Sequence, residues 1–198
     1  MNTMQKLNEK VILTDCDGVL LDWSYHFQKF MKWKGYTLVN GNAYSVKEQY
    51  GFETKAEARA MTSEFNNSAY VRYMTPHRDA IKYIKKLHEE AGYVFHVITS
   101  MSTNPYAYKA RLENLNDLFG KNVIEKLICL DTGADKDETL AEYKDTGCLW
   151  VEDKFENALV GHKLGLDSVL MDFEHNKNDN HPEILRVRNW EDIYHYTV

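Results

Sequence analysis

The sequence predicts an α/β protein with a doubly wound, mainly parallel sheet and a small helical cap inserted after the first strand. One observation is that short apolar runs rich in β-branched residues alternate with helical patterns along most of the chain, which is typical of βαβ units. The other is that a helical, aromatic-rich stretch interrupts this alternation directly after the first run. We therefore expect a core domain of residues 1–19 and 74–198, and a second unit, called the cap below, of residues 20–73.

Five apolar runs are expected to form the strands of the core. In open α/β sheets, ligands bind at the carboxyl ends of the strands, so the loops after the first four runs should lie together on one rim. The expected strands cover residues 11–13, 94–98, 127–130, 149–151 and 168–171, and the helical patterns between them cover residues 79–91, 106–118, 136–143 and 156–164.

Two helices are expected in the cap. Trp23, Phe27 and Phe30 recur at helical spacing, which predicts an amphipathic helix. Thr54 and Glu57 have the spacing of a capping box, which predicts a second helix that begins there and continues to about residue 66. Inserted segments of this kind often cover active sites.

The composition is that of an ordinary soluble globular protein, with 198 residues, 43% of them hydrophobic, and a formal net charge of −6. An acidic chain is a poor match for nucleic-acid polymers, which need a basic surface, and no apolar stretch is long enough to span a bilayer. Residues 1–10 are polar and lack the apolar region of a signal peptide. We therefore expect a cytoplasmic protein that has neither a nucleic-acid polymer nor a membrane as its partner.

The first apolar run ends at Asp15 and Asp17, which are followed at once by Gly18. Two carboxylates at the end of a buried strand are costly to desolvate unless a divalent cation compensates them. A glycine lets backbone N–H groups approach a ligand closely. This pattern favours a site for Mg²⁺ and phosphate in which one aspartate is free to act as a nucleophile, although the same residues alone are also typical of an Asx-rich turn.

Polar residues also follow three of the other expected strands. Thr99 and Ser100 offer hydroxyl donors for a phosphoryl oxygen, or they cap the next helix. Lys136 could neutralise a carboxylate and a phosphate, or it is a solvated surface lysine. Glu152 and Asp153 are a second acidic pair that could bind metal, or they are the first turn of a helix.

Taken in order, these four motifs resemble those of the haloacid dehalogenase superfamily, and the match covers the chain from Val11 to about Met171. The resemblance implies a Mg²⁺-dependent site for phosphoryl transfer. Asp15 would be the nucleophile that forms an aspartyl-phosphate, and Asp17 would be the general acid and then the general base. The presence of Asp17 implies phosphoryl chemistry, because the dehalogenase branch lacks this second aspartate.

The resemblance also implies which residues hold the ligands. Mg²⁺ would be bound by Asp15, by the backbone carbonyl of Asp17 and by Asp153, with Glu152 as a supporting acid. The phosphoryl oxygens would be held by the side chains of Thr99 or Ser100, by Lys136 and by backbone amides near Gly18.

Within this superfamily, the stretch from Asp17 to Trp23 is similar to the opening of the 5′(3′)-deoxyribonucleotidases, as are Pro105-Tyr106 and the segment 189–192. This implies that the substrate is a small phosphorylated molecule, and specifically a nucleoside monophosphate. Trp23 would contact the nucleobase, with Phe27 beside it as a further substrate residue. The alternative for Trp23 is that it packs in the hinge of the cap.

One position departs from that branch, because Ala134 stands where the animal enzymes have an arginine two residues before the lysine. Lys109 or Arg111, on the helix after Thr99, could replace that contact. The alternative for both residues is a solvated helix face.

Two other functions remain open at this stage. The same site would serve a phosphatase or a phosphomutase for a sugar phosphate or another small metabolite. A protein of a different class, which binds metal and phosphate without catalysis, could keep the same residues. The segment 175–181 contains two histidines whose spacing fits no common zinc signature, so it is interpreted as a polar surface loop.

Overall fold

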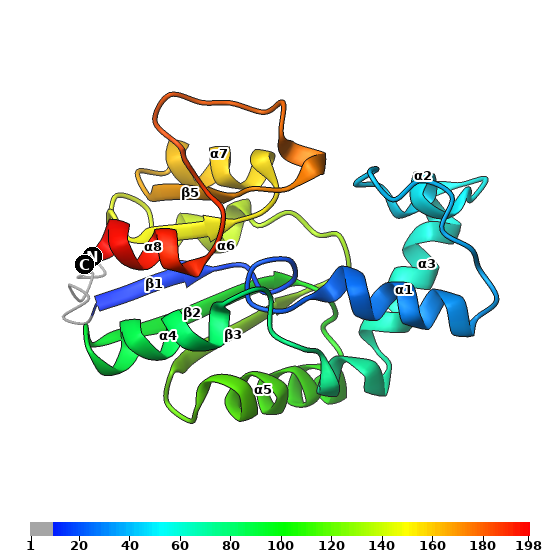
Figure 1. Cartoon of the computed structure of the whole chain (residues 1–198), viewed down its shortest axis with the longest axis horizontal. Coiled ribbons are helices and arrows are strands. Elements are labelled where there is room, and N and C mark those ends of the chain that lie inside the picture. The colour runs from blue at the N-terminus through cyan, green and yellow to red at the C-terminus, as the bar shows by residue number, and fades with distance from the viewer. Residues whose placement is uncertain (1–9) are drawn as a thin grey trace.

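One six-stranded parallel sheet forms the centre of the molecule. The structure is a computed structural model that describes residues 10–198 (Figure 1); the expectation about a signal peptide depends on residues 1–9 and lies outside the described residues. The strand order is β3-β2-β1-β4-β5-β6, with every pair parallel, which confirms the predicted fold class. The strands are β1 (Lys10–Thr14), β2 (Tyr93–Ser100), β3 (Ile124–Leu130), β4 (Leu149–Glu152), β5 (Asp167–Met171) and β6 (Leu185–Val187).

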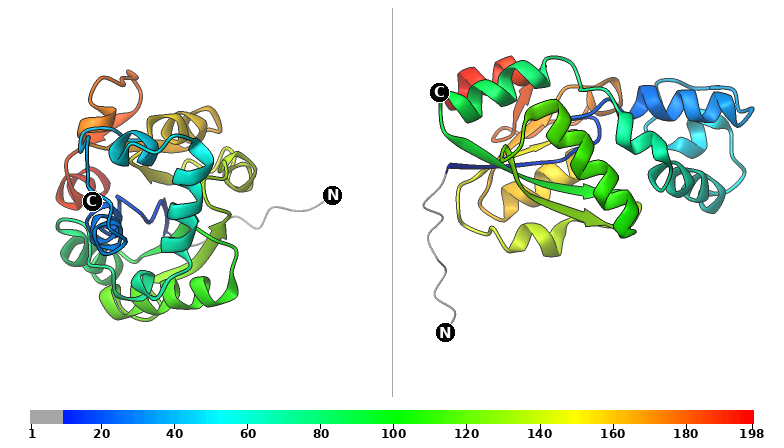
Figure 2. Two further views of the ribbon diagram at one scale, coloured as in Figure 1. Left: turned by 90° about the vertical axis from the view of Figure 1, so that its right-hand side faces the viewer. Right: turned by 90° about the horizontal axis from the view of Figure 1, so that it is seen from below.

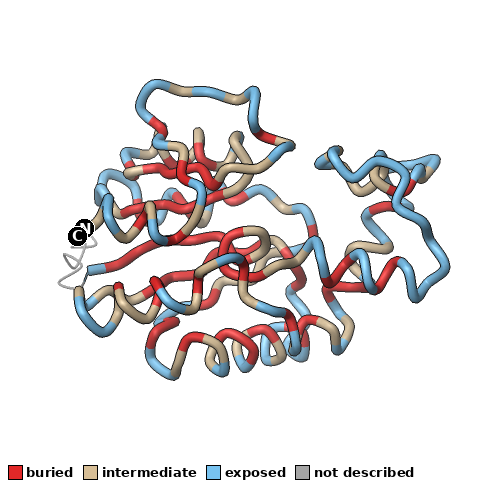
Figure 3. The backbone as a smooth tube through the Cα atoms, in the orientation of Figure 1, coloured by how far each residue is buried: buried red, intermediate tan, exposed pale blue. Residues whose placement is uncertain are grey.

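Strand β1 lies in the middle of the sheet and is buried on both faces. Ile12 packs into one hydrophobic cluster, whereas Val11 and Leu13 pack into another on the opposite face. This explains why the strand is a continuous apolar run rather than an alternating one. Figure 3 shows the buried positions concentrated along the central strands.

Helices cover both faces of the sheet (Figure 2). Helices α4, α5 and α8 pack on the face that Ile12 contacts, and α6 and α7 pack on the other. No helix of the described residues is long and apolar enough to cross a lipid bilayer. The helices of the core are α4 (Ala80–Glu89), α5 (Pro105–Phe119), α6 (Asp137–Ala141), α7 (Phe155–Lys163) and α8 (Trp190–Thr197), and a 3₁₀ turn, η2, covers Glu174–Asn176.

The cap projects beyond the carboxyl end of β1 (Figure 1). The capping box is present as expected, because the Thr54 hydroxyl accepts from the Glu57 N–H and the Glu57 carboxylate accepts from the Thr54 N–H. Phe65 is fully buried at the centre of an aromatic cluster. The elements of the cap are α1 (Trp23–Trp33), α2 (Val46–Tyr50), α3 (Lys55–Asn66) and the 3₁₀ turn η1 (Ala69–Tyr73).

The two connections between sheet and cap run side by side. Leu21 forms an antiparallel bridge with Pro76, and the Asp22 N–H donates to the Thr75 carbonyl over 2.9 Å. The chain therefore enters and leaves the cap through one short two-stranded ladder.

Candidate active site

The loops after β1 and β4 are in direct contact. The Asp15 N–H donates to the Val151 carbonyl over 2.9 Å, which extends the pairing of β1 with β4 by one residue. Gly18 has φ +82°, and a Cβ placed on it would lie 2.6 Å from Asp153 Oδ2. A side chain at position 18 would thus collide with the predicted metal ligand, so glycine is required here for both conformation and space.

Lys136 connects three of the predicted motifs. Its Nζ lies 2.9 Å from Asp15 Oδ1 and 2.8 Å from Glu152 Oε2, and the residue is only 3% exposed. Burial by itself lowers the pKa of Lys136, but the carboxylates of Asp15 and Glu152 outweigh it and raise the pKa above its ordinary value. Lys136 is therefore a buried cation and not the solvated lysine of the alternative interpretation.

Three carboxylates converge beside this single ammonium group. Oxygen atoms of Asp15, Glu152 and Asp153 all lie within 4.8 Å of one another. Burial raises the pKa of Asp15 to about 7, with Lys136 opposing the rise and Glu152 adding to it. Burial also raises the pKa of Asp153 well above its usual range. Such an excess of buried negative charge is what a divalent cation neutralises, and an all-oxygen donor set suits Mg²⁺.

Glu152 accepts hydrogen bonds from the loop that carries Asp153 and from Lys136. It is fully buried, and Oε1 accepts from the N–H groups of Asp153 and Lys154 over 3.2 and 3.1 Å. Oε2 accepts from Lys136 and from Asn157 Nδ2. Although burial opposes ionisation, Lys136 and these donors lower the pKa of Glu152 below its ordinary value. Both oxygens are thus engaged in holding the loop and the lysine.

The segment after β5 holds Asp153 in place. The Asp153 carbonyl accepts from Asn176 Nδ2 over 2.7 Å and lies 3.0 Å from His175 Nε2. Asn176 is only 1% exposed. The interpretation of 175–181 as a polar surface loop is therefore wrong at its first two residues, because they pack under the loop that carries Asp153.

Arg111 binds Asp17. The guanidinium is fully buried on α5, and Nη1 donates to Asp17 Oδ1 while Nη2 donates to Oδ2 over 3.3 Å. Nη1 also lies 3.0 Å from Cys16 Sγ. The alternative interpretation, that Arg111 lies on a solvated helix face, is thus wrong, because Arg111 is buried and binds the candidate general acid. Lys109 does have an exposed side chain, 4.0 Å from Glu113.

The two hydroxyls at the end of β2 have different surroundings. Thr99 is almost completely buried at the end of the strand. The Ser100 hydroxyl donates to the Ala134 carbonyl over 2.7 Å, which ties the second motif loop to the third. Because the Ser100 hydrogen is already donated, Thr99 is the better candidate for a phosphoryl contact.

Trp23 and Phe27 stack on each other in the cap, with ring centroids 4.4 Å apart. Phe27 is buried and packs against Phe30, Tyr50 and Phe65. It is thus part of the aromatic core of the cap, which corrects the expectation that it contacts substrate. Trp23 is partly buried, and its Nε1–H donates to Asn66 Oδ1 over 3.1 Å. Asn66 Nδ2 in turn donates to the Met101 carbonyl over 3.0 Å, so this pair connects the cap to the loop after β2.

Tyr44 is a cap residue near the group of Asp15, Glu152 and Asp153, and the sequence did not single it out. Its ring lies 4.8 Å from that of His175 and is 54% exposed. Burial of the hydroxyl raises the pKa of Tyr44, and the charges of Asp153, Glu152 and Asp15 raise it further. The Tyr44 hydroxyl thus lies near enough to the acidic group for its charges to act on it, although the residue as a whole is about half exposed. Only its place in an aromatic-rich cap hinted at this.

Comparisons with known proteins agree with this architecture. No protein-family model matches the chain. An uncharacterised 32.4 kDa protein of Enterobacteria phage T4 is 30% identical over 131 residues, which cover 60% of this chain and 44% of that protein. The chain thus spans less than half the length of this relative.

Solved structures resemble the whole described chain more closely in shape than in sequence. A haloacid dehalogenase-like hydrolase from Streptococcus pneumoniae has 12% identity and a TM-score of 0.66, with 95% of this chain and 98% of that chain covered. The HAD-hydrolase YfnB from Bacillus subtilis, whose structure is bound to magnesium, has 14% identity, 95% and 98% coverage, and a TM-score of 0.60. The L-2-haloacid dehalogenase of Xanthobacter autotrophicus has 10% identity, 94% and 97% coverage, and a TM-score of 0.59.

Identities this low report on the fold and not on the reaction, since the matched structures include dehalogenases as well as other hydrolases. The strand order, the inserted cap and the coverage of nearly the whole chain agree on one architecture. The chain therefore has the fold of the haloacid dehalogenase-like hydrolases.

Proposed function

We propose that this protein is a Mg²⁺-dependent phosphatase that hydrolyses a nucleoside monophosphate through an aspartyl-phosphate on Asp15. The observation that carries the proposal is the buried Lys136, bound to both Asp15 and Glu152 beside Asp153. A bound Mg²⁺ would be held by the carboxylates of Asp15 and Asp153 and by the backbone carbonyl of Asp17. It would supply positive charge for the phosphoryl oxygens.

Asp15 is oriented for nucleophilic attack. Its Oδ1 accepts from the Cys16 N–H over 2.7 Å and from Lys136 Nζ, which fixes the carboxylate and leaves Oδ2 to attack phosphorus. The Oδ2–P bond forms as the bond from phosphorus to the leaving oxygen breaks. Lys136 would stabilise the phosphoryl oxygens by its charge, and Thr99 by a hydrogen bond from its hydroxyl.

Asp17 performs the proton transfers. It gives a proton to the leaving oxygen, and it later takes a proton from the water that attacks the aspartyl-phosphate and releases inorganic phosphate. Arg111 engages both oxygens of Asp17 and so orients the carboxyl group, and each oxygen keeps a second lone pair that can carry the transferred proton. The presence of this acid favours phosphoryl chemistry over dehalogenation.

The nucleotide assignment rests on the resemblance of residues 17–23 to the deoxyribonucleotidases and on the aromatic residues of the cap. Tyr44 has a half-exposed ring near the acidic group, and Trp23 is partly exposed at the start of α1. Flat rings of this kind stack well on a nucleobase. A cytoplasmic location remains part of the same proposal.

Phosphate release from a panel of deoxynucleoside, ribonucleoside and sugar monophosphates tests this function. Halide release from 2-haloacids is measured beside it, as the test for dehalogenase activity. Each is assayed with Mg²⁺, with EDTA and with Asp15→Asn. Asp135→Asn is the matched control, because Asp135 is an exposed acid next to Lys136.

We expect Mg²⁺-dependent turnover of deoxynucleotides that Asp15→Asn abolishes and Asp135→Asn retains. Turnover confined to sugar phosphates would keep the phosphatase and overturn the nucleotide assignment. Metal-independent turnover of 2-haloacids would overturn the phosphatase. Mg²⁺ binding with no turnover of any compound would overturn the enzymatic proposal in favour of a binding protein.

A further inference from the structure

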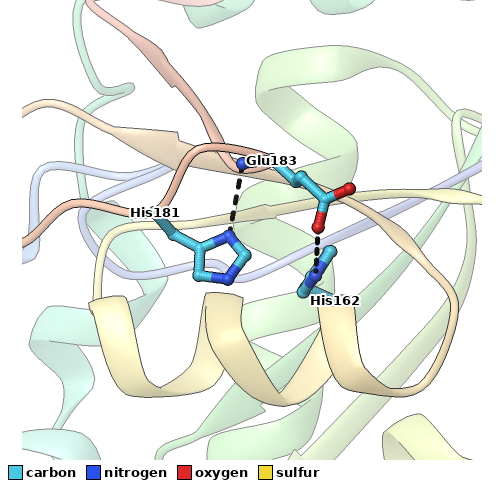
Figure 4. A group of neighbouring side chains, drawn as sticks. All are labelled: His162, His181 and Glu183. Atoms are coloured by element: carbon cyan, nitrogen blue, oxygen red, sulfur yellow. Dashed lines mark hydrogen bonds and ion pairs between the residues drawn. The ribbon is translucent and has the colours of Figure 1, made fainter.

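A second group of metal-binding side chains lies on α7 and on the segment between β5 and β6 (Figure 4). His162 belongs to α7, whereas His181 and Glu183 precede β6. One ligand atom from each residue lies within 4.8 Å of the others. The rings of His162 and His181 have centroids 4.6 Å apart, and His162 Nε2 lies 3.4 Å from Glu183 Oε2.

We propose that His162, His181 and Glu183 form a binding site for a divalent transition-metal ion, with Zn²⁺ as the representative ion. In a tetrahedral zinc site with N and O ligands at about 2.0–2.1 Å, neighbouring ligand atoms lie about 3.3 Å apart. His162 Nε2 and Glu183 Oε2 are already separated by about this ligand-to-ligand distance. Two imidazoles and one carboxylate leave the fourth position for water.

To bind the same ion, the imidazole of His181 has to move closer to His162 and Glu183. Its Nδ1 accepts a long hydrogen bond of 3.3 Å from the Glu183 N–H, which costs little to lose. His162 and His181 are only partly exposed, and the Glu183 side chain is 72% exposed. The side-chain rotations needed for ligation therefore take place at the surface and disturb no packed residue of the core.

The ligand chemistry separates this site from the catalytic acids. Imidazole suits Zn²⁺, Cu²⁺ and Ni²⁺, whereas carboxylate, carbonyl and water suit Mg²⁺. Asp15, Glu152 and Asp153 supply oxygen only. An excess of Mg²⁺ should thus fill the catalytic site and leave the histidine site for Zn²⁺.

A metal ion here would link two elements that adjoin Asp153. Helix α7 begins two residues after Asp153, and the segment that carries His181 also carries Asn176, which donates to the Asp153 carbonyl. Arg186 ties Asn176 and Asp179 of this segment to β6. The ion would therefore clamp the segment 172–184 onto α7.

Calorimetric titration of the whole chain with Zn²⁺, in excess Mg²⁺, tests the site. The variants are His181→Gln and His162→Gln, and His195→Gln is the matched control because His195 is an exposed histidine on α8. Losing a hydrogen-bond partner of a ligand costs metal affinity about 10- to 100-fold, so losing a ligand should weaken binding by at least about tenfold. We also expect Zn²⁺ to raise the Tm of the wild type and of His195→Gln, but not of His181→Gln.

Asp153→Asn separates the two metal sites. We expect it to keep the Zn²⁺ affinity of the wild type, since it removes a catalytic acid and leaves the histidine site intact. Zn²⁺ binding that His181→Gln leaves unchanged, or that Asp153→Asn abolishes, would overturn the proposal. Absence of any Zn²⁺ binding to the folded wild type in excess Mg²⁺ would overturn it as well. None of these outcomes depends on whether the protein hydrolyses phosphate esters.

Discussion

The guanidinium of Arg111 grips both carboxylate oxygens of Asp17, and the arginine is completely buried while the aspartate side chain is 20% exposed. Because the guanidinium is buried, no water molecule competes with Arg111 for the carboxylate from that side. The carboxylate therefore has one fixed partner inside the protein, while part of its surface stays exposed. This arrangement makes Arg111 a positioning residue for the proposed acid and base.

Arg111→Lys should lower kcat more for alkyl phosphates than for p-nitrophenyl phosphate. Lysine keeps the charge but cannot form the two-pronged contact, so Asp17 loses its orientation. A general acid contributes about 10²–10⁴ in rate, and a good leaving group needs little of it. Steady-state kinetics with both substrates measure the difference.

Lys109→Met is the matched control for Arg111→Lys, because Lys109 is exposed on the same helix. It should leave both rates unchanged. Equal losses for the two substrates in Arg111→Lys would contradict a role through Asp17 and would indicate a general structural defect.

Gly18→Ala should weaken Mg²⁺ binding as well as stability. The new Cβ would lie 2.6 Å from Asp153 Oδ2, which pushes a proposed ligand out of place. The positive φ adds a strain of about 1–2 kcal/mol. Mg²⁺ titration and denaturant unfolding measure the two effects separately.

Gly92→Ala provides the comparison, since Gly92 has φ +75° and nothing lies within 4 Å of its added Cβ. It should lose similar stability while Mg²⁺ binding stays as in the wild type. If both variants bind Mg²⁺ normally, the contact between Gly18 and Asp153 does not position the metal ligand.

Tyr44→Phe should raise KM with little change in kcat. The phenol lies near the proposed catalytic acids, whose charges raise its pKa. A single hydrogen bond from it to the substrate would contribute about 0.5–1.5 kcal/mol, which corresponds to a rise in KM of about 2- to 12-fold. Tyr44→Ala should raise KM further, because it also removes the ring. Tyr73→Phe, at a 74% exposed cap residue, should have no effect. A fall in kcat alone would argue against substrate binding by Tyr44.

His77 should make the protein less stable as the pH falls below about 6.5. Burial, together with the charge of Arg78, lowers the pKa of His77 to about 4. The folded state therefore holds the neutral ring, and protons bind the unfolded state first. The stabilisation is complete above the unfolded pKa of about 6.5 and is lost as the pH falls towards 4, by about 2 kcal/mol at pH 5.

Urea unfolding at pH 7.5 and at pH 5 measures this loss, with His77→Phe as the comparison. Phenylalanine keeps the aromatic packing against Phe173, whose ring centroid is 5.2 Å away, and it cannot titrate. The variant should lose about 2 kcal/mol less than the wild type over this pH interval. An identical loss in both proteins would mean that other groups carry the acid sensitivity.

The central strands could be predicted because they are buried on both faces and are therefore continuous apolar runs. The last strand, β6, could not, since it is a three-residue edge strand with only Val187 buried. The proximity of Asp15, Lys136 and Asp153 followed from parallel topology, which brings loop ends together whatever their sequence separation.

Pairings between side chains of distant elements could not be predicted. Arg111 stands at helical spacing from the buried Ala107 and Leu115, but a charged residue is usually exposed. Only the packing of α5 against the first loop shows that its partner is Asp17. Along the chain, the histidine nearest to His181 is His175, and their spacing fits no zinc signature. In the folded protein, the neighbour of His181 is His162. Spacing along the sequence carries no information about contacts that tertiary packing creates.

The ladder formed by Leu21 and Pro76 has a consequence for how the protein can vary. Because the residues that enter and leave the cap are paired with each other, the cap is an insertion whose two ends are held together beside the sheet. Lengthening a loop costs little free energy once its ends are held together. Insertions, deletions or a wholly different segment can therefore replace the cap without altering the order of the strands, so substrate preference can diverge while the catalytic loops stay the same.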